Sequence, residues 1–142
     1  MSRGAGYSGT PLARKLGYKP GMRVYLDAAP DDYAEIVAPL PDGVEFLKMP
    51  GKPLDLVHVF TTSAAGLAAK LKRYRPLVEP AGVIWVSWPK KAAKVPTDVT
   101  EDVVRDVALP LGLVDVKVCA VDAVWSGLKL VVRKELRAGL LF

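Results

Sequence analysis

Cysteine, histidine and side-chain amides are scarce in this chain of 142 residues. Cys119 is the only cysteine, His58 is the only histidine, and asparagine and glutamine do not occur. A single cysteine excludes a disulfide framework within the chain, and the two residues together exclude zinc sites built on several Cys and His ligands. Any Ser-His-Asp or Cys-His catalysis would depend on His58 alone. We therefore expect no metal site, and the chain contains no catalytic motif.

Long apolar runs are absent as well. No segment approaches the roughly 20 apolar residues of a membrane-spanning helix, and the opening MSRGAGYSGTPL lacks the apolar core of a signal peptide. We expect a cytoplasmic protein with no membrane partner. The net charge of +5 is compatible with an acidic partner, but the basic residues are spread along the chain rather than gathered in an arm or tail.

The length fits a single domain over residues 1–142, with the small, Gly-rich residues 1–9 as a loose lead-in. The missing amides fit either selection against thermolabile side chains or a skewed genome. In both cases the usual amide readers of adenine edges are missing.

The most informative stretch is Gly82 to Lys91, GVIWVSWPKK. Its β-branched and aromatic residues follow a glycine turn, a pattern typical of a strand buried on both faces in the middle of a parallel sheet. Trp88, Lys90 and Lys91 come at its carboxyl end. In open α/β sheets that end is where ligands bind, so we expect the functional site there.

Hydrophobic periodicity and turn residues predict helices and strands in alternation along most of the chain. The expected helices span 11–16, 31–37, 62–74 and 98–109, with Thr10, Asp31 or Asp32, Thr62 or Ser63, and Asp98 as N-caps. The expected strands span 22–28, 44–49, 54–60, 82–87, 113–121 and 125–133.

The last two strands differ from the others because each alternates between apolar and polar residues. In the first, Val114, Val116, Val118 and Ala120 are expected on one face, and Asp115, Lys117 and Cys119 on the other. In the second, Leu128, Leu130 and Val132 are expected to face inward. The short gap between these strands predicts an antiparallel hairpin that closes the domain.

This order of elements predicts a doubly wound α/β fold, with right-handed crossovers and the strands arranged 2-1-3-4-6-5 in space. The last but one strand in that arrangement is antiparallel. Together with the lead KPGMRV into the first strand, the layout resembles the Rossmann-like fold of S-adenosylmethionine-dependent methyltransferases, shortened by one strand and one helix. The fold class is therefore a methyltransferase-like open sheet, mostly parallel, with a C-terminal antiparallel hairpin.

The loop after the first strand departs from that resemblance. Methyltransferases of this kind carry a GxGxG-type turn there, which lets backbone approach the cofactor, whereas this chain reads Asp27-Ala-Ala-Pro-Asp-Asp. Pro30 also removes a backbone donor. The acidic residue that binds the ribose near the end of the second strand is replaced by Lys48, Met49 and Pro50. We expect the fold without S-adenosylmethionine or another resident cofactor.

A second resemblance covers nearly the whole chain. The segments YSGTPLARKLG, PDDYAE, VSWPKK, TEDVVRDVALPLGLVDVKVCAVD and WSGLKLVVRKEL occur here in that order. On these segments the chain is similar to a family of small bacterial proteins known as the domain of unknown function numbered three thousand and fifty-two. The resemblance implies no activity.

The candidate ligand-binding crevice lies at the carboxyl ends of the first, third and fourth strands. It would be lined by Asp27, Ala28, Thr61, Thr62, Ser63, Trp88 and Lys90. Asp27 is either a general base or ligand anchor, or a cap of the turn. Thr62 and Ser63 either bind an anion at a helix N-terminus or act as a plain N-cap.

Other residues have similar alternatives. Trp88 with Lys90 and Lys91 could stack on a base and hold its phosphate, or be a packed Trp beside two solvated lysines. His58 fits a hydrogen-bonded core histidine better than a catalytic one. Cys119 fits a packing residue. Trp125, near the hairpin tip, either folds back on the sheet or anchors a partner.

Three functions fit these observations. The first is a non-catalytic binding or interaction protein, with a regulatory role, that takes a small molecule or a protein partner. The second is a divergent S-adenosylmethionine-dependent methyltransferase that uses Asp27 and the crevice. The third is a nucleic-acid-binding protein that uses Lys90, Lys91 and Lys94, with Arg73 and Arg75 as further contacts.

Overall fold

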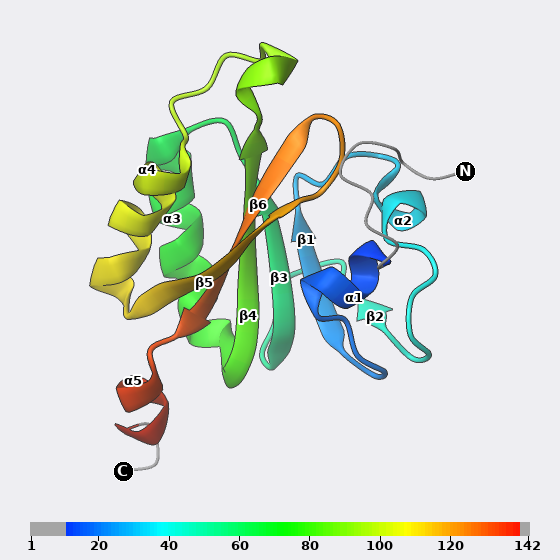
Figure 1. The fold of residues 1–142 in the computed structure, drawn as a ribbon. Helices are drawn as coiled ribbons and strands as arrows, with labels where there is room; N and C mark the ends of the chain where they lie inside the picture. Colours follow the sequence, from blue (N-terminus) through cyan, green and yellow to red (C-terminus); the bar gives the residue numbers. More distant parts are fainter. Residues whose placement is uncertain (1–10, 140–142) are drawn as a thin grey trace.

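The computed structural model describes residues 11–139, and Thr10 and the 1–9 lead-in lie outside them. Figure 1 shows a central sheet between two layers of helices. The elements are α1 (Leu12–Leu16), β1 (Arg23–Asp27), α2 (Tyr33–Ile36), β2 (Glu45–Phe46), β3 (Leu54–Phe60), α3 (Ala64–Tyr74), β4 (Val78–Pro89), α4 (Glu101–Ala108), β5 (Leu113–Ala120), β6 (Trp125–Val132) and α5 (Lys134–Gly139). No helix among these residues is long and apolar enough to cross a membrane.

The sheet has six strands in the order β2-β1-β3-β4-β6-β5. The pairs among β2, β1, β3 and β4 are parallel, whereas β6 is antiparallel to both β4 and β5. The predicted fold class and strand order are therefore confirmed. The carboxyl ends of β1, β3 and β4 lie at one edge of the sheet.

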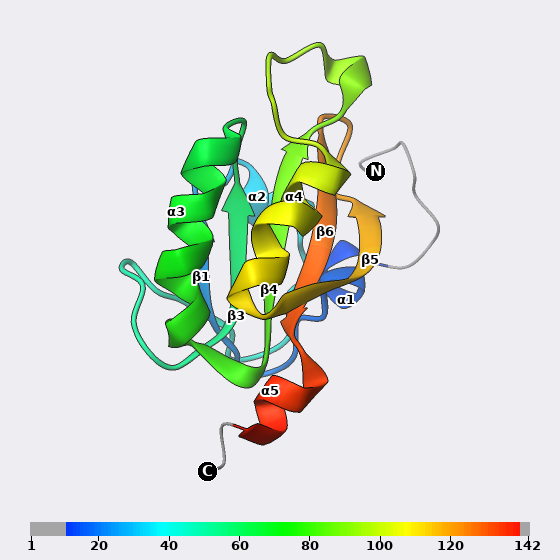
Figure 2. The ribbon, with the colours of Figure 1, turned by 90° about the vertical axis from the view of Figure 1, so that its left-hand side faces the viewer.

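The core consists of two apolar clusters, one on each face of the sheet. Figure 2 shows α3 and α4 in front of the sheet and α1 and α2 behind it. The front cluster contains the predicted inward residues Leu67, Leu71 and Tyr74 of α3. The rear cluster contains Leu16 and the fully buried Trp85, whose indole nitrogen donates to the Leu16 carbonyl at 2.8 Å. This bond holds α1 against the middle of the sheet.

His58 is a hydrogen-bonded core residue, as expected. It is fully buried, with Nδ1 2.9 Å from the Tyr33 hydroxyl and Nε2 2.8 Å from the Ser87 hydroxyl. The Tyr33 hydroxyl in turn lies 2.7 Å from that of Tyr18. This chain of polar groups joins α2 and the turn after α1 to β3 and β4. Because a neutral imidazole has one donor and one acceptor, both ring nitrogens are satisfied without a charge.

Three predicted helix and strand boundaries are wrong. The strand expected over 82–87 begins at Val78 and continues to Pro89, so Gly82 lies within β4 and not at a turn. The strand expected over 44–49 is reduced to Glu45–Phe46, because only these residues pair with β1. Asp98 does not cap α4. Thr100 does so instead, since its hydroxyl accepts from the Val103 N–H at 3.2 Å. Asp32 occupies the N-cap position of α2 without a capping bond from its side chain.

The predicted alternation of the 113–121 strand is also wrong. The pairing of β5 with β6 shifts between Asp115 and Lys117, which makes a β-bulge at Val116. A bulge inserts one extra residue and reverses the alternation beyond it. Val116 and Val118 are consequently half exposed, whereas Cys119 is buried against the α1 side of the sheet. Burial raises the pKa of the Cys119 thiol, which agrees with the expected packing role.

Stability should fall in acid because of His58. Burial lowers its pKa from 6.5 to about 3, so between these values the unfolded chain binds a proton that the folded chain does not. Stability is then complete above pH 6.5 and declines as the pH falls toward 3, by at most roughly 1.4 kcal/mol per pH unit. Urea unfolding at several pH values measures this slope.

His58→Gln supplies the control because its side chain does not titrate. The variant should be less stable at neutral pH but lose that component of the acid slope. An unchanged slope in His58→Gln would show that other groups cause the acid sensitivity.

Candidate functional site

Asp27 ends β1 at the expected edge of the sheet, but its carboxylate is already bound. Oδ1 accepts from Lys70 Nζ at 2.8 Å, and Oδ2 accepts a short hydrogen bond from the Tyr74 hydroxyl. Both partners belong to α3. Asp27 therefore ties β1 to α3 and caps no turn, while its role as a general base or ligand anchor stays a prediction.

Thr61, Thr62 and Ser63 form the start of α3. The Thr61 hydroxyl accepts from the Ser63 N–H at 3.1 Å, and the Ser63 hydroxyl accepts from the Gly66 N–H at 3.1 Å. Ser63 is thus the N-cap, the plainer of the two alternatives. The Thr62 carbonyl accepts from the Thr97 hydroxyl at 2.8 Å.

Asp98 occupies the N-terminus of α3 together with Ser63. Its Oδ1 accepts from the Ala64 N–H at 2.7 Å. A carboxylate at this end of a helix complements the helix dipole. The helix N-terminus at which an external anion could have bound is therefore occupied by the Asp98 carboxylate. The same contact fixes the 94–100 loop against α3.

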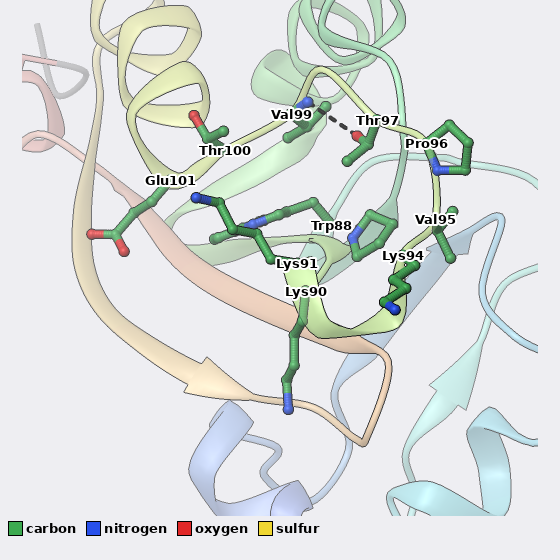
Figure 3. Close-up of a pocket in the computed structure, with 11 residues that line it drawn as sticks. Trp88, Lys90, Lys91, Lys94, Val95, Pro96, Thr97, Val99, Thr100 and Glu101 are labelled. Carbon is green, nitrogen blue, oxygen red and sulfur yellow. Dashed lines mark hydrogen bonds between the residues drawn. The ribbon is translucent and has the colours of Figure 1, made fainter.

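A hollow of about 620 Å³ opens beside the end of β4. Figure 3 shows its lining, which comes from β4, the loop after it and the start of α4. The lining residues are Trp88, Pro89, Lys90, Lys91, Lys94, Val95, Pro96, Thr97, Val99, Thr100 and Glu101. Of the predicted site residues, the structure thus places Trp88 and Lys90 in this hollow and the others outside its lining.

The hollow is cationic with apolar walls. Lys91 and Lys94 are exposed and Lys90 is half buried, whereas the Trp88 ring belongs to the front core and is only 8% exposed. In Figure 3, Lys91 extends toward Thr100 and Glu101, and Lys90 extends in the opposite direction. Only a small part of Trp88 is therefore available to a ligand.

Arg105 binds the acidic residues beside this hollow. Its guanidinium is bound to Glu101, and also to Asp102 at 3.0 Å and Asp115 at 2.9 Å. Glu101 is the only acidic residue among those that line the hollow within the described chain. The lining therefore carries three lysines against one glutamate, and this positive balance suits an anionic ligand.

Backbone strain occurs at the same edge of the sheet. Within residues 11–139, Ala28 and Lys94 are the only residues other than glycine with positive φ, at 58° and 55°. This left-handed conformation costs a residue with a Cβ roughly 1–2 kcal/mol. Such strain clusters at functional sites. Ala28 follows β1, and Lys94 lines the hollow.

The β1 loop does not fit S-adenosylmethionine in the manner of a glycine-rich turn. Ala28 keeps the backbone conformation that glycine favours, but it carries a methyl group that hinders the close backbone approach a glycine would allow. Pro30 has no N–H to donate. Residues 47–50 after β2 include no acidic side chain for a ribose either, and Glu45 of β2 pairs with Arg23.

The fold is nevertheless that of methyltransferases. The chain is similar to a proposed methyltransferase from Thermoplasma acidophilum, with 7% identity and a TM-score of 0.56 over 89% of this chain and 76% of that one. It is similar to a ribosomal protein L11 methylase from Lactobacillus delbrueckii, with 10% identity and a TM-score of 0.52 over 85% and 74%. At such identities the likeness establishes the fold alone.

LepI in its complex with S-adenosylmethionine (SAM) is a third similar structure. Identity is 14% and the TM-score is 0.55, over 86% of this chain but only 39% of LepI. No family model matches the chain, and no curated protein is similar to it in sequence. Membership of the family of unknown function therefore stays a prediction.

Sequence analysis missed Thr97, Val99 and Thr100 as walls of the hollow. These residues lie in the 94–100 loop, which folds back only because Thr97 and Asp98 bind the start of α3. One local signal was present, since Thr100 is followed directly by Glu101 and Asp102, as expected at the first turn of a helix. That signal places the N-cap of α4 at Thr100, so Asp98 is available to bind the N-terminus of α3.

Lys94→Gly should stabilise the fold, although it removes one of the three positive charges that line the hollow. Glycine relieves the left-handed strain, for a gain of up to about 1 kcal/mol. Lys91→Gly is the matched control, because Lys91 lies in the 3-10 turn Lys91–Ala93, where glycine should cost roughly 0.5–1 kcal/mol. Urea denaturation measures both. Equal losses in the two variants would contradict a strained Lys94.

Proposed function

We propose that the protein binds a small anionic molecule with an apolar or aromatic part, of the nucleotide class, in the hollow beside β4. The observation that carries this proposal is that Lys90, Lys91 and Lys94 all line one hollow with apolar walls at the carboxyl edge of the sheet. This edge is where doubly wound sheets bind their ligands.

The electrostatics and the volume support this ligand class. The lysines outnumber Glu101 in the lining, so the hollow has a positive balance of charge that attracts phosphates. A space of about 620 Å³ lies within the range of small-molecule sites. Trp88 and Val99 give the ligand an apolar wall, and Thr97 and Thr100 add hydroxyl groups to the lining.

A thermal-shift experiment with adenosine triphosphate, adenosine and inorganic triphosphate tests this proposal. Ligand at about 100 times its Kd stabilises by roughly 2.7 kcal/mol, which for a chain of this size is a rise in Tm of at least about 5 °C. Adenosine triphosphate should give the largest rise, because it fills both the cationic and the apolar part.

Lys91→Glu should abolish most of the rise. Lys72→Glu, at an exposed position of α3 outside the hollow, makes the same charge change and should preserve it. The absence of any shift with the three probes, or an equal loss in both variants, would overturn the proposal.

A divergent S-adenosylmethionine-dependent methyltransferase is the second candidate. The likeness in fold favours it, since the neighbouring structures include a proposed methyltransferase, a methylase and a complex with S-adenosylmethionine. Such an enzyme would have to hold its cofactor without a glycine turn and with Asp27 engaged by Lys70 and Tyr74. The left-handed Ala28 is the feature of the β1 loop that it would retain.

Calorimetry with S-adenosylmethionine and S-adenosylhomocysteine tests the second candidate. An enzyme of this class should bind both compounds, and Ala28→Leu should abolish the binding because a larger side chain fills the turn. Ala34→Leu, at an exposed position of α2, is the control and should bind normally. No heat with either compound at millimolar concentration would exclude this enzyme.

A further inference from the structure

Four lysines gather on the α1 side of the sheet, away from the hollow. They are Lys15 of α1, Lys19 in the turn after it, Lys117 of β5 and Lys129 of β6. Lys117 and Lys129 are directly opposite each other in the antiparallel β5–β6 pair, and Trp85 is opposite Lys129 on the next strand. Because the Trp85 indole holds the Leu16 carbonyl, the end of α1 lies beside this row.

The like charges affect one another. Partial burial lowers the pKa of Lys129, and the ammonium groups of Lys117 and Lys19 lower it further. The charges of Lys15 and Lys117 also oppose the rise in the pKa of Cys119 that burial causes. Lys19 and Lys117 thus lie close enough to affect Lys129, and Lys15 and Lys117 lie close enough to affect Cys119.

Within the described residues, none of these four lysines forms an ion pair with a carboxylate. The ion pairs within residues 11–139 involve Arg23, Lys70 and Arg105 instead. Like charges directly opposite each other destabilise a sheet. The fold therefore keeps an unfavourable pair at Lys117 and Lys129, which a bound anion would relieve.

The bulge at Val116 creates this arrangement. Regular alternation would put Lys117 on the same face as Asp115, whose carboxylate is bound to Arg105 of α4. The extra residue turns Lys117 to the other face, toward Lys129. Bulges that re-aim a side chain in this way are typical of functional edges of sheets.

We infer that Lys15, Lys19, Lys117 and Lys129 form a contact surface for the phosphate backbone of a nucleic acid. The four charges come from three elements and a turn, and they are spread over a strand pair and a helix end, which suits a ligand with repeated charges better than a single phosphate. Lysine binds phosphate as a point charge, so this surface would position a nucleic acid without reading its sequence.

Fluorescence anisotropy with labelled duplex DNA and single-stranded RNA tests the inference across a range of salt concentrations. Four phosphate contacts predict a slope of log K against log salt of about −3.6 for a duplex and about −2.8 for a single strand. Lys117→Glu should weaken binding severalfold and reduce the size of the slope by about 1.

The same variant separates lost binding from lost folding. The introduced carboxylate would face Lys129 as an opposite charge, so the Tm of Lys117→Glu should rise by about 1–3 °C while its affinity falls. Lys72→Glu, exposed on α3 at the other face, has the same net charge and should bind nearly as the unmodified protein does.

Three results would overturn the inference. They are an affinity that does not respond to salt, an equal loss of affinity in Lys72→Glu, and binding to vesicles rich in anionic lipid without binding to either nucleic acid.

Discussion

β3 and β4 carry apolar side chains on both of their faces, and this double burial requires helices on both sides of the sheet. Leu54, Val57 and Val59 belong to the front core, whereas Leu56 and Phe60 belong to the rear core. The longer helices α3 and α4 cover the front. At the rear, α1 and α2 have only five and four residues, so individual contacts of large side chains have to hold them.

Those rear contacts are partly polar. The Trp85 indole holds α1 through the Leu16 carbonyl, and the chain from Tyr18 through Tyr33 and His58 to Ser87 holds α2. Phe60 adds edge-on packing to both Tyr33 and Trp125, so Trp125 folds back on the sheet. Buried polar groups are costly unless paired, which makes this network specific to one arrangement of the rear layer.

The front and the rear of the sheet also differ in their charges. At the front, Arg105 gathers Glu101, Asp102 and Asp115, and Lys70 engages Asp27. These carboxylates are bound by neighbouring side chains, and in the lining of the hollow three lysines outnumber the single Glu101. At the rear, the bulge at Val116 brings Lys117 to Lys129. In β5, Asp115 and Lys117 therefore lie on opposite faces of the sheet.

Much of the fold could be predicted from the sequence because its signals are local. The apolar run of β3, the inward stripe of α3 at Leu67, Leu71 and Tyr74, and the turn residues between elements depend on neighbours a few positions away. The strand order followed from the alternation of strands and helices, since crossovers have one hand. Trp88 and Lys90 could be placed at the ligand edge for the same reason.

Contacts between distant residues determined the rest. Asp98 resembles a cap for the helix that follows it, but the N-terminus of α3, 34 positions earlier, takes its carboxylate. Asp27 looks available at a strand end, but Lys70 and Tyr74 reach it across the sheet. The bulge at Val116 arises from the pairing of β5 with β6. The alternation of residues within β5 does not predict it. The sequence by itself determined the elements and their order, and tertiary packing decided which charged groups remain open to a ligand, because each ion pair depends on segments that meet only in the folded chain.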